Sequence, residues 1–479
     1  TTTSETNVTP LTSITQVIST QVADSGTIKI LGTSSITGVV GSSAASIGTI
    51  EAGVNSEIVT FNNMVYAKNL NYTGNGTVVL NGQTGTNVNT AGMVGTIDFG
   101  TNVTNTGTLQ IGDNVNLTTG SEGINFVDAN GATLTFNGSS IVNGNVGSLS
   151  GTDTFKIINA GLDSETVRFN NNIYFMDSLN LSEDGIIEIA NNKYVQRSST
   201  SATTGAIITT TTDGEGTLNY LGNTVLYGQI GTTGKRLNAV NFNTATNNIV
   251  QKINYSVYAD DTTIGHISSI NDTATNLTDV TGQYDYAGAT TIKEWRGQTV
   301  ANITSDITFG GNLTIADEKS AINFGTSHVT VDGDFTTNDG AMSFTVNTRD
   351  ITGINQAGST SSGSALVIAD TLAMSGDEKI HINYVGSLAN NGSYTLIHGL
   401  NDISSKLNNL NSSNSSDTGS TDLTETNSLL KSIKDFITGD PGEPEQNEIG
   451  NSELTEKNFS TRLISVGSSS CPSDKNINW

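Results

Sequence analysis

The sequence is poor in residues that crosslink, kink or charge a chain. Its 479 residues include one cysteine, Cys471, so neither an internal disulfide nor a cysteine metal cluster can form. Only 4 prolines are present, and three of them lie beyond residue 440, so proline hardly interrupts any strand. No apolar run reaches the length of a membrane-spanning helix. These absences favour a long body exported in unfolded form over a small disulfide-stapled module.

Charge is also scarce, and it is mostly negative. Charged residues make up 14% of the chain, and 45 acidic residues against 20 basic ones give a net charge of −25. Nucleic acid is excluded as a partner because binding it requires a basic surface. An anionic membrane surface would repel the chain, and we expect no direct membrane insertion of this segment. Abundant Thr, Asn and Ser with 52 glycines could suggest disorder, but apolar residues alternate regularly with polar ones.

The chain contains an internal repeat. A sixteen-residue phrase occurs three times without gaps, as GTIKILGTSSITGVVG at 26–41, ATLTFNGSSIVNGNVG at 132–147 and GTLNYLGNTVLYGQIG at 216–231. In each copy an alternating segment meets a glycine and a second alternation begins, which predicts strand, turn and strand. A unit this small cannot bury its own apolar face, so neighbouring units must stack to form a core.

The repeat extends beyond the phrase. Each copy is followed by a related segment, at 57–67, 165–175 and 249–259, and the variable distance between copies indicates loops inserted on a fixed scaffold. Short strands and turns rich in Asn and Gly predict an all-β chain folded as a right-handed parallel β-helix (β-solenoid), with one coil every ~20–25 residues. Asn suits the corners because it tolerates left-handed backbone, and stacked Asn side chains can bond between coils. An irregular antiparallel β-array is the alternative.

Composition divides the chain into five segments. They are an N-terminal cap or first strand at 1–25, the β-solenoid at 26–400, a low-complexity linker at 401–421, a short amphipathic helix at 422–439 and an acidic, polar tail at 440–479. Asp422 and Glu425 form a capping box for the helix, and its apolar residues share one face. We expect the tail to be disordered.

Two stretches interrupt the alternation and are predicted to be loops or irregular coils. One is the Thr/Ser tract at 197–212, within a candidate contact loop at 197–215, and the other is the Asp- and Tyr-bearing stretch 260–296. The second contains the candidate binding residues Tyr284, Tyr286 and Trp295. For Trp295, packing beneath the loop is the preferred interpretation over a binding hot spot.

No pattern of catalytic, cofactor-binding or metal-binding residues is found. The four histidines lie apart in the sequence: His266, His328, His381 and His398. Neither HExxH nor GxSxG occurs, and GQIGTTGK at 228–235 has the wrong spacing for a phosphate loop. Asp332 and Asp334 would share one strand face, but exposed turn aspartates explain them better than a carboxylate pair. The chain is therefore predicted not to be an enzyme and to need no cofactor.

The repeated phrases resemble the passenger regions of rickettsial surface cell antigens, an autotransporter family that includes outer membrane proteins A and B. The resemblance rests on the GTIKILG-type strands, the EIVTFNN and ETVRFNN phrases and the closing GSYTLIHG, and it covers residues 26–400. It implies export, delivery to the bacterial cell surface by a C-terminal β-barrel translocator, and adhesion to host cells, invasion or a coat role. We expect this chain to be a passenger segment without its own translocator.

The leading hypothesis is a non-enzymatic surface adhesin or coat segment that contacts a host cell-surface protein through exposed loops. A polysaccharide-acting β-helix enzyme is an alternative, and it would need a groove of carboxylates beside aromatic platforms. A purely structural surface spacer is the third possibility. Aromatic residues are only 6% of the chain, which counts against the enzyme.

Overall fold

The structure is a computed structural model, and it describes the larger part of the segment predicted to form the solenoid. The described residues are 5–8, 13–82, 93–100, 106–120, 123–199, 201, 205–242, 250–253, 255–265, 274–280, 285–294, 297–347, 367–374, 379–385, 395–399, 460–466 and 477–478. The chain divides into two compact units, Thr1–Ala239 and Val240–Trp479. The predicted linker at 401–421 and helix at 422–439 lie outside the described residues.

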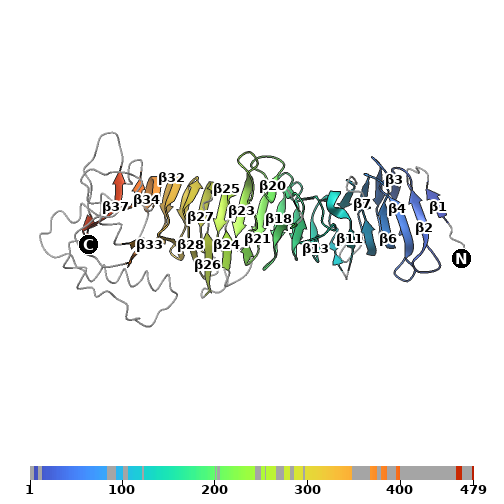
Figure 1. Cartoon of the computed structure of the whole chain (residues 1–479), viewed down its shortest axis with the longest axis horizontal. Coiled ribbons are helices and arrows are strands. Elements are labelled where there is room, and N and C mark those ends of the chain that lie inside the picture. Colours follow the sequence, from blue (N-terminus) through green and yellow to red (C-terminus); the bar gives the residue numbers. More distant parts are fainter. Residues whose placement is uncertain are drawn as a thin grey trace. The chain divides into compact units, whose positions relative to one another are not determined.

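In the first unit, strands from successive coils pair side by side into parallel sheets (Figure 1). The first sheet contains β1 (Glu5–Val8), β2 (Ser25–Ile30), β4 (Ile47–Ala52), β6 (Tyr66–Tyr72), β8 (Met93–Asp98) and β11 (Asn125–Val127). The second sheet contains β3 (Ser34–Ile36), β5 (Ile58–Phe61), β7 (Thr77–Leu80), β9 (Thr108–Ile111), β12 (Thr133–Phe136), β14 (Ile157–Ala160), β17 (Ser178–Leu181) and β20 (Ile208–Thr210). All pairings within these two sheets are parallel.

The remaining strands of this unit follow the same rule. A third set of parallel strands contains β10 (Leu117–Thr118), β13 (Ser140–Asn143), β15 (Thr166–Phe169), β18 (Ile186–Ile189) and β21 (Thr217–Tyr220). β16 (Ile173–Phe175) pairs in parallel with β19 (Val195–Arg197). A 3₁₀ turn occupies Ala129–Gly131, and β22 (Thr224–Val225) and β23 (Leu237–Phe242) follow β21 along the chain.

The second unit is built in the same way. One sheet contains β24 (Val250–Ile253), β26 (Ala274–Val280), β28 (Gly297–Ile303), β31 (Ser320–Gly325), β33 (Ala341–Asn347) and β35 (Lys379–Val385). The other contains β25 (Val257–Ile264), β27 (Asp285–Ile292), β29 (Ile307–Gly310), β30 (Leu313–Ile315), β32 (Val329–Thr337), β34 (Val367–Met374), β36 (Thr395–Gly399), β37 (Ser460–Val466) and β38 (Ile477–Asn478). Their described pairings are parallel except for β37 with β38.

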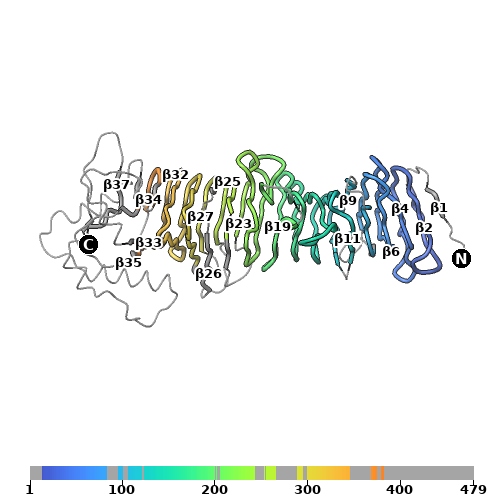
Figure 2. The backbone as a smooth tube through the Cα atoms, in the orientation of Figure 1, coloured from blue at the N-terminus to red at the C-terminus, as the bar shows by residue number. Residues whose placement is uncertain are grey.

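These pairings confirm an all-β chain of parallel sheets, an arrangement consistent with a β-solenoid. The alternative of an antiparallel array is wrong, because parallel neighbours come from successive coils. The backbone tube in Figure 2 follows these coils through the first unit. Bonds between coils join residues 22 apart at Asp24 and Ser46 and 21 apart at Asn159 and Asn180, which agrees with the predicted coil length.

Strand alternation places one face of each strand in the core. In β12 the side chains of Leu134 and Phe136 are buried, and the alternating Thr133 and Thr135 are half-exposed. Phenylalanines from different coils meet inside: Phe136 packs edge-on against Phe169 at a centroid distance of 5.8 Å, and Phe99 against Phe155 at 5.5 Å. Because every coil contributes such residues, the apolar faces that a single repeat leaves open are covered by its neighbours.

Asparagine side chains form the predicted bonds between coils. Asn81 Nδ2 donates to Asn62 Oδ1 at 2.7 Å, and Asn180 Nδ2 donates to Asn159 Oδ1 at 3.1 Å. In the second unit, Asn323 Nδ2 donates to Asn302 Oδ1 at 3.0 Å. Left-handed corners outside glycine are taken by aspartate, serine and one glutamate as well as asparagine: Asp24, Ser56, Asn114, Asp128, Asp163, Ser164, Glu183, Asn192 and Asp339.

The structure corrects the two predicted loops. The stretch 260–296 is not a loop throughout, since it contains the end of β25, all of β26 and all of β27. The Thr/Ser tract 197–212 contains β20, and Arg197 holds the segment before it by donating to the carbonyl oxygens of Gly205 at 2.9 Å and Ala206 at 2.6 Å.

The ends of the chain give two further results. The predicted cap at 1–25 includes β1, whose residues pair in parallel with β2, so this segment begins the first sheet. The expectation of disorder throughout 440–479 is wrong for β37, where Ile464 pairs in register with Ile397 of β36. Ile464 and Val466 keep the every-second-residue spacing of the earlier strands, which is the pattern that the polar composition of the tail hides.

Candidate binding surface

Three tyrosines gather on the surface of the first unit, and we call them the tyrosine cluster: Tyr174 in β16, Tyr194 directly before β19, and Tyr227 after β22. The rings of Tyr194 and Tyr227 meet edge to face, with centroids 5.4 Å apart and planes at 88°. Their side chains are exposed, at 36% for Tyr194 and 42% for Tyr227. Among the described residues of this unit, Tyr194 and Tyr227 are the aromatic side chains that are exposed.

Strand alternation explains why these rings point outward. Tyr174 lies between the fully buried Ile173 and Phe175. Tyr194 precedes the buried Val195, and Tyr227 follows the buried Leu226. Since adjacent residues of an extended chain face opposite sides, each buried neighbour sets its tyrosine on the surface.

Asparagine carboxamides hold the backbone beneath the cluster. The N–H of Tyr194 donates to Asn172 Oδ1 at 3.1 Å, and the N–H of Asn172 donates to Asn145 Oδ1 at 3.2 Å. The N–H of Asn223 donates to Asn191 Oδ1 at 2.8 Å. Within the part of the chain that the structure describes, the Nδ2 groups of Asn145, Asn172 and Asn191 make no bond. Fixed amide donors therefore lie at the corners that carry the rings.

The Tyr227 phenol is uncharged near neutral pH. Partial burial raises the pKa of the Tyr227 phenol, and the neighbouring phenols of Tyr194 and Tyr174 raise that pKa further. A phenol whose pKa lies above 10 keeps its proton at pH 7. The surface can thus offer aromatic faces, hydroxyls and amide donors, which is a combination suited to binding rather than to acid–base catalysis.

The binding residues predicted from the sequence lie elsewhere. Tyr286 is in strand β27 rather than in a loop, and it pairs in register with Val257 on one side and Phe309 on the other. Tyr284 and Trp295 lie outside the described residues.

A sequence signal for the tyrosine cluster does exist. Asn171-Asn172-Ile173-Tyr174 and Asn191-Asn192-Lys193-Tyr194 place a tyrosine at the same distance from an Asn-Asn corner. The phrase at 165–175 draws attention to the first copy, but the second copy falls between repeats. Only the coil pairing shows that both corners belong to one surface, because it sets Ile173 opposite Val195.

The histidines and aspartates considered for catalysis form no site in the described chain. His328 Nδ1 lies 3.6 Å from Asp306 Oδ1, and both side chains are exposed. Asp332 and Asp334 are exposed on one face of β32, so they share a strand face as predicted, but they lie within a strand rather than in a turn. Among the described residues, no group of three or more His, Cys, Asp or Glu side chains could hold a metal ion. His266 lies outside those residues.

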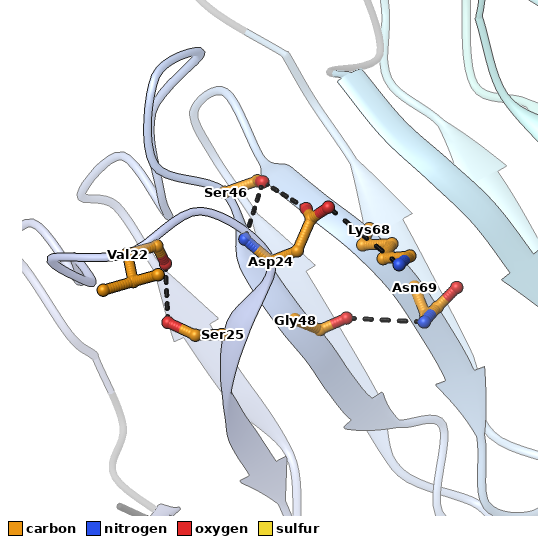
Figure 3. Close-up of polar contacts among 7 residues, drawn as sticks. All are labelled: Val22, Asp24, Ser25, Ser46, Gly48, Lys68 and Asn69. Atoms are coloured by element: carbon orange, nitrogen blue, oxygen red, sulfur yellow. Dashed lines mark hydrogen bonds and ion pairs between the residues drawn. The ribbon is translucent and has the colours of Figure 1, made fainter. Parts of the chain in front are cut away.

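A polar network in the first sheet has a structural role (Figure 3). Ser46 Oγ donates to Asp24 Oδ1 at 2.6 Å, and Lys68 Nζ lies 4.0 Å from Asp24 Oδ2. Asn69 Nδ2 donates to the carbonyl oxygen of Gly48 at 3.5 Å. The two hydrogen bonds each join neighbouring coils, and the Lys68–Asp24 contact reaches across the coil between them, so the network ties three coils together.

Comparisons with protein-family models, with characterised proteins and with solved structures give no match to this chain. In the described residues, no helix has both the length and the apolar character needed to cross a membrane.

Proposed function

We propose that the chain is a surface-presented autotransporter passenger segment, folded as a right-handed parallel β-helix, that acts as an adhesin or surface-coat protein in attachment to or invasion of host cells. The proposal joins the family resemblance of residues 26–400 to the stacked parallel strands of both units. Stacked coils give a stiff scaffold with corners that tolerate insertions. The partner in this proposal is a host cell-surface protein, and the chain itself performs no chemistry.

The tyrosine cluster is the observation that carries the proposal. Tyrosine is enriched among the residues that dominate binding energy, because it gives a large, rigid contact area at low entropic cost. On a surface made chiefly of Thr, Asn and Ser, the paired rings of Tyr194 and Tyr227 are exposed and do not serve to cover the apolar core. A spacer has no need of such a pair.

Charge supports the same proposal. A net charge of −25 would attract a basic partner surface and raise its association rate, and salt would weaken that attraction. Contacts through the tyrosine rings depend little on salt. The association rate should therefore fall as salt is added, whereas the part of the affinity that the tyrosine rings contribute should not.

The test is binding of the fluorescently labelled full chain to host cells across a salt series. We expect saturable binding that slows with salt, and a loss of about tenfold or more in affinity in the variant carrying both Tyr194→Ser and Tyr227→Ser. Tyr255→Ser is the matched control, because Tyr255 is exposed to the same 36% but lies outside the cluster. Absence of any saturable binding would contradict the adhesin and favour the spacer.

A further inference from the structure

We infer that the tyrosine cluster is a carbohydrate-binding platform, and that its ligand is an uncharged pyranose glycan carried by the host cell-surface protein. The inference rests on the proposed function and names the chemistry of its partner. It concerns three rings, Tyr174, Tyr194 and Tyr227, and the asparagine corners that hold them.

The first argument is the shape of the aromatic surface. In the edge-to-face pair at 5.4 Å, the edge of one ring covers one face of the other, and both side chains are still exposed to solvent. The carbon–hydrogen face of a pyranose is apolar and flat, and it packs against such a ring as other apolar groups do. Neighbouring coils are separated by about 4.8 Å, which is close to the length of one hexopyranose unit.

The second argument is the supply of hydrogen bonds. A sugar presents hydroxyls that both donate and accept. The oxygens of Asn172 and Asn191 accept from backbone N–H groups, which fixes the carboxamides with their Nδ2 donors unused within the described chain. The phenol of Tyr227 keeps its proton at neutral pH and can donate or accept. The rings can thus pack against the apolar face of a sugar, and the fixed amides beside them can hydrogen-bond its hydroxyls.

The third argument is charge, which decides between neutral and acidic glycans. The three tyrosines of the cluster include no acidic or basic side chain, and Lys193 is the one cation within the Asn-Asn-Lys-Tyr corner. The chain as a whole carries −25, so an acidic sugar approaches against the field of the protein.

The experiment measures binding of the full chain to two immobilised probes by biolayer interferometry: a neutral hexose–N-acetylhexosamine oligosaccharide and its sialylated counterpart. We expect weak binding of the neutral probe, on the order of 0.1–1 mM, weaker binding of the sialylated probe, and a loss of tenfold or more for Tyr194→Ser. Tyr255→Ser should bind like the unchanged protein. Circular dichroism on each variant checks that the fold is retained.

Each outcome decides something different. If cells bind the chain before and after enzymatic removal of their glycans, and neither probe binds, the carbohydrate inference is overturned while the adhesin stands on a protein contact. If a probe binds equally to Tyr194→Ser, the site is not the tyrosine cluster. A preference for the sialylated probe would overturn the assignment to neutral sugars. Failure of both cells and probes to bind would overturn the proposed function as well.

Discussion

At the scale of single residues, buried hydroxyls interrupt the apolar interior of the second unit. Thr262 and Thr290 pair in register on β25 and β27, both are fully buried, and neither Oγ1 meets a hydrogen-bond partner among the described residues. An unsatisfied buried hydroxyl costs about 1–3 kcal/mol. Valine has the shape of threonine without the hydroxyl, so Thr290→Val should raise the free energy of unfolding by about 1 kcal/mol.

Urea unfolding followed by circular dichroism measures this change. Thr290→Ser is the matched control, because serine keeps the hydroxyl and loses a methyl group, and it should lower stability. A destabilised Thr290→Val variant would show that the hydroxyl has a partner that matters, such as a buried water.

Buried phenols make the stability of the first unit depend on alkaline pH. Burial raises the pKa of Tyr72 well above its ordinary value, and burial also raises the pKa of Tyr220. The neutral phenol is thus favoured in the folded state, so its contribution is complete below about pH 10 and is lost as the pH rises toward the folded pKa. Stability should be level from pH 7 to 9 and fall above about pH 10.

Replacing one phenol tests the cause. Tyr72→Phe removes one titrating group and should reduce the slope of stability against pH by up to about 1.4 kcal/mol per pH unit. It also removes the bond from Tyr72 OH to the carbonyl oxygen of Thr108 at 2.8 Å, so the slope is the readout rather than the absolute stability. Equal slopes for Tyr72→Phe and the unchanged protein would contradict the assignment.

At the scale of elements, close corner contacts set how coils stack. A Cβ on Gly185 would lie 1.6 Å from the carbonyl oxygen of Gly161, which itself has a φ of 65°. Backbone cannot yield as a flexible side chain does, so Gly185→Ala should cost about 2–3 kcal/mol. Gly234→Ala is the control, because its Cβ would meet no atom within 4 Å. Thermal unfolding of both variants gives the comparison, and equal melting temperatures would contradict the stated contact.

The predictable part of the elements is the strand, turn and strand of each repeat. The phrase at 26–41 forms β2 and β3, and the phrase at 132–147 forms β12 and β13. Their sheets were not predictable: β2 and β3 lie in the first and second sheets, whereas β12 lies in the second and β13 in the third set of parallel strands. A phrase fixes which side chains face inward, but its partners depend on the coils before and after it.

The missed strands at 260–296 have a local cause. The pairing of β25 with β27 shifts register between Tyr258 and Asp261, and a bulge of this kind breaks the two-residue period. Gly288 lies at the shift with a φ of 86°, and a Cβ there would meet the carbonyl oxygen of Ala259 at 2.1 Å. The irregular alternation therefore resembled a loop. The tyrosine cluster was missed for another reason, since its members join only when coils stack.

At the scale of the whole molecule, a stack of coils should respond locally to damage. Each coil contacts chiefly its neighbours, so stability is close to a sum of coil and interface terms. Phe169→Ala removes a fully buried ring that packs on Phe136, and it should cost about 3–5 kcal/mol. We expect hydrogen exchange to accelerate in β12, β13, β15 and β18 and to stay unchanged in β32 and β33.

Hydrogen exchange read by mass spectrometry shows that pattern directly. Ile141→Ala is a suitable control, because Ile141 is exposed on β13 near the same coils. Uniform acceleration through both units would mean that the chain unfolds as one cooperative body rather than as a one-dimensional stack.

The hydrogen bond between the Asn81 and Asn62 side chains lies at a site where the protein can deamidate with time. Asn81 is followed by Gly82, whose small size leaves its backbone nitrogen open to attack the carbonyl carbon of the Asn81 carboxamide. The side-chain nitrogen leaves as ammonia, and hydrolysis of the resulting succinimide yields aspartate or isoaspartate. The Nδ2 donor that now lies 2.7 Å from Asn62 Oδ1 is then replaced by a carboxylate oxygen, and two acceptors face each other. Ageing in storage or in tissue would thus begin at the corners and loosen the molecule one coil at a time.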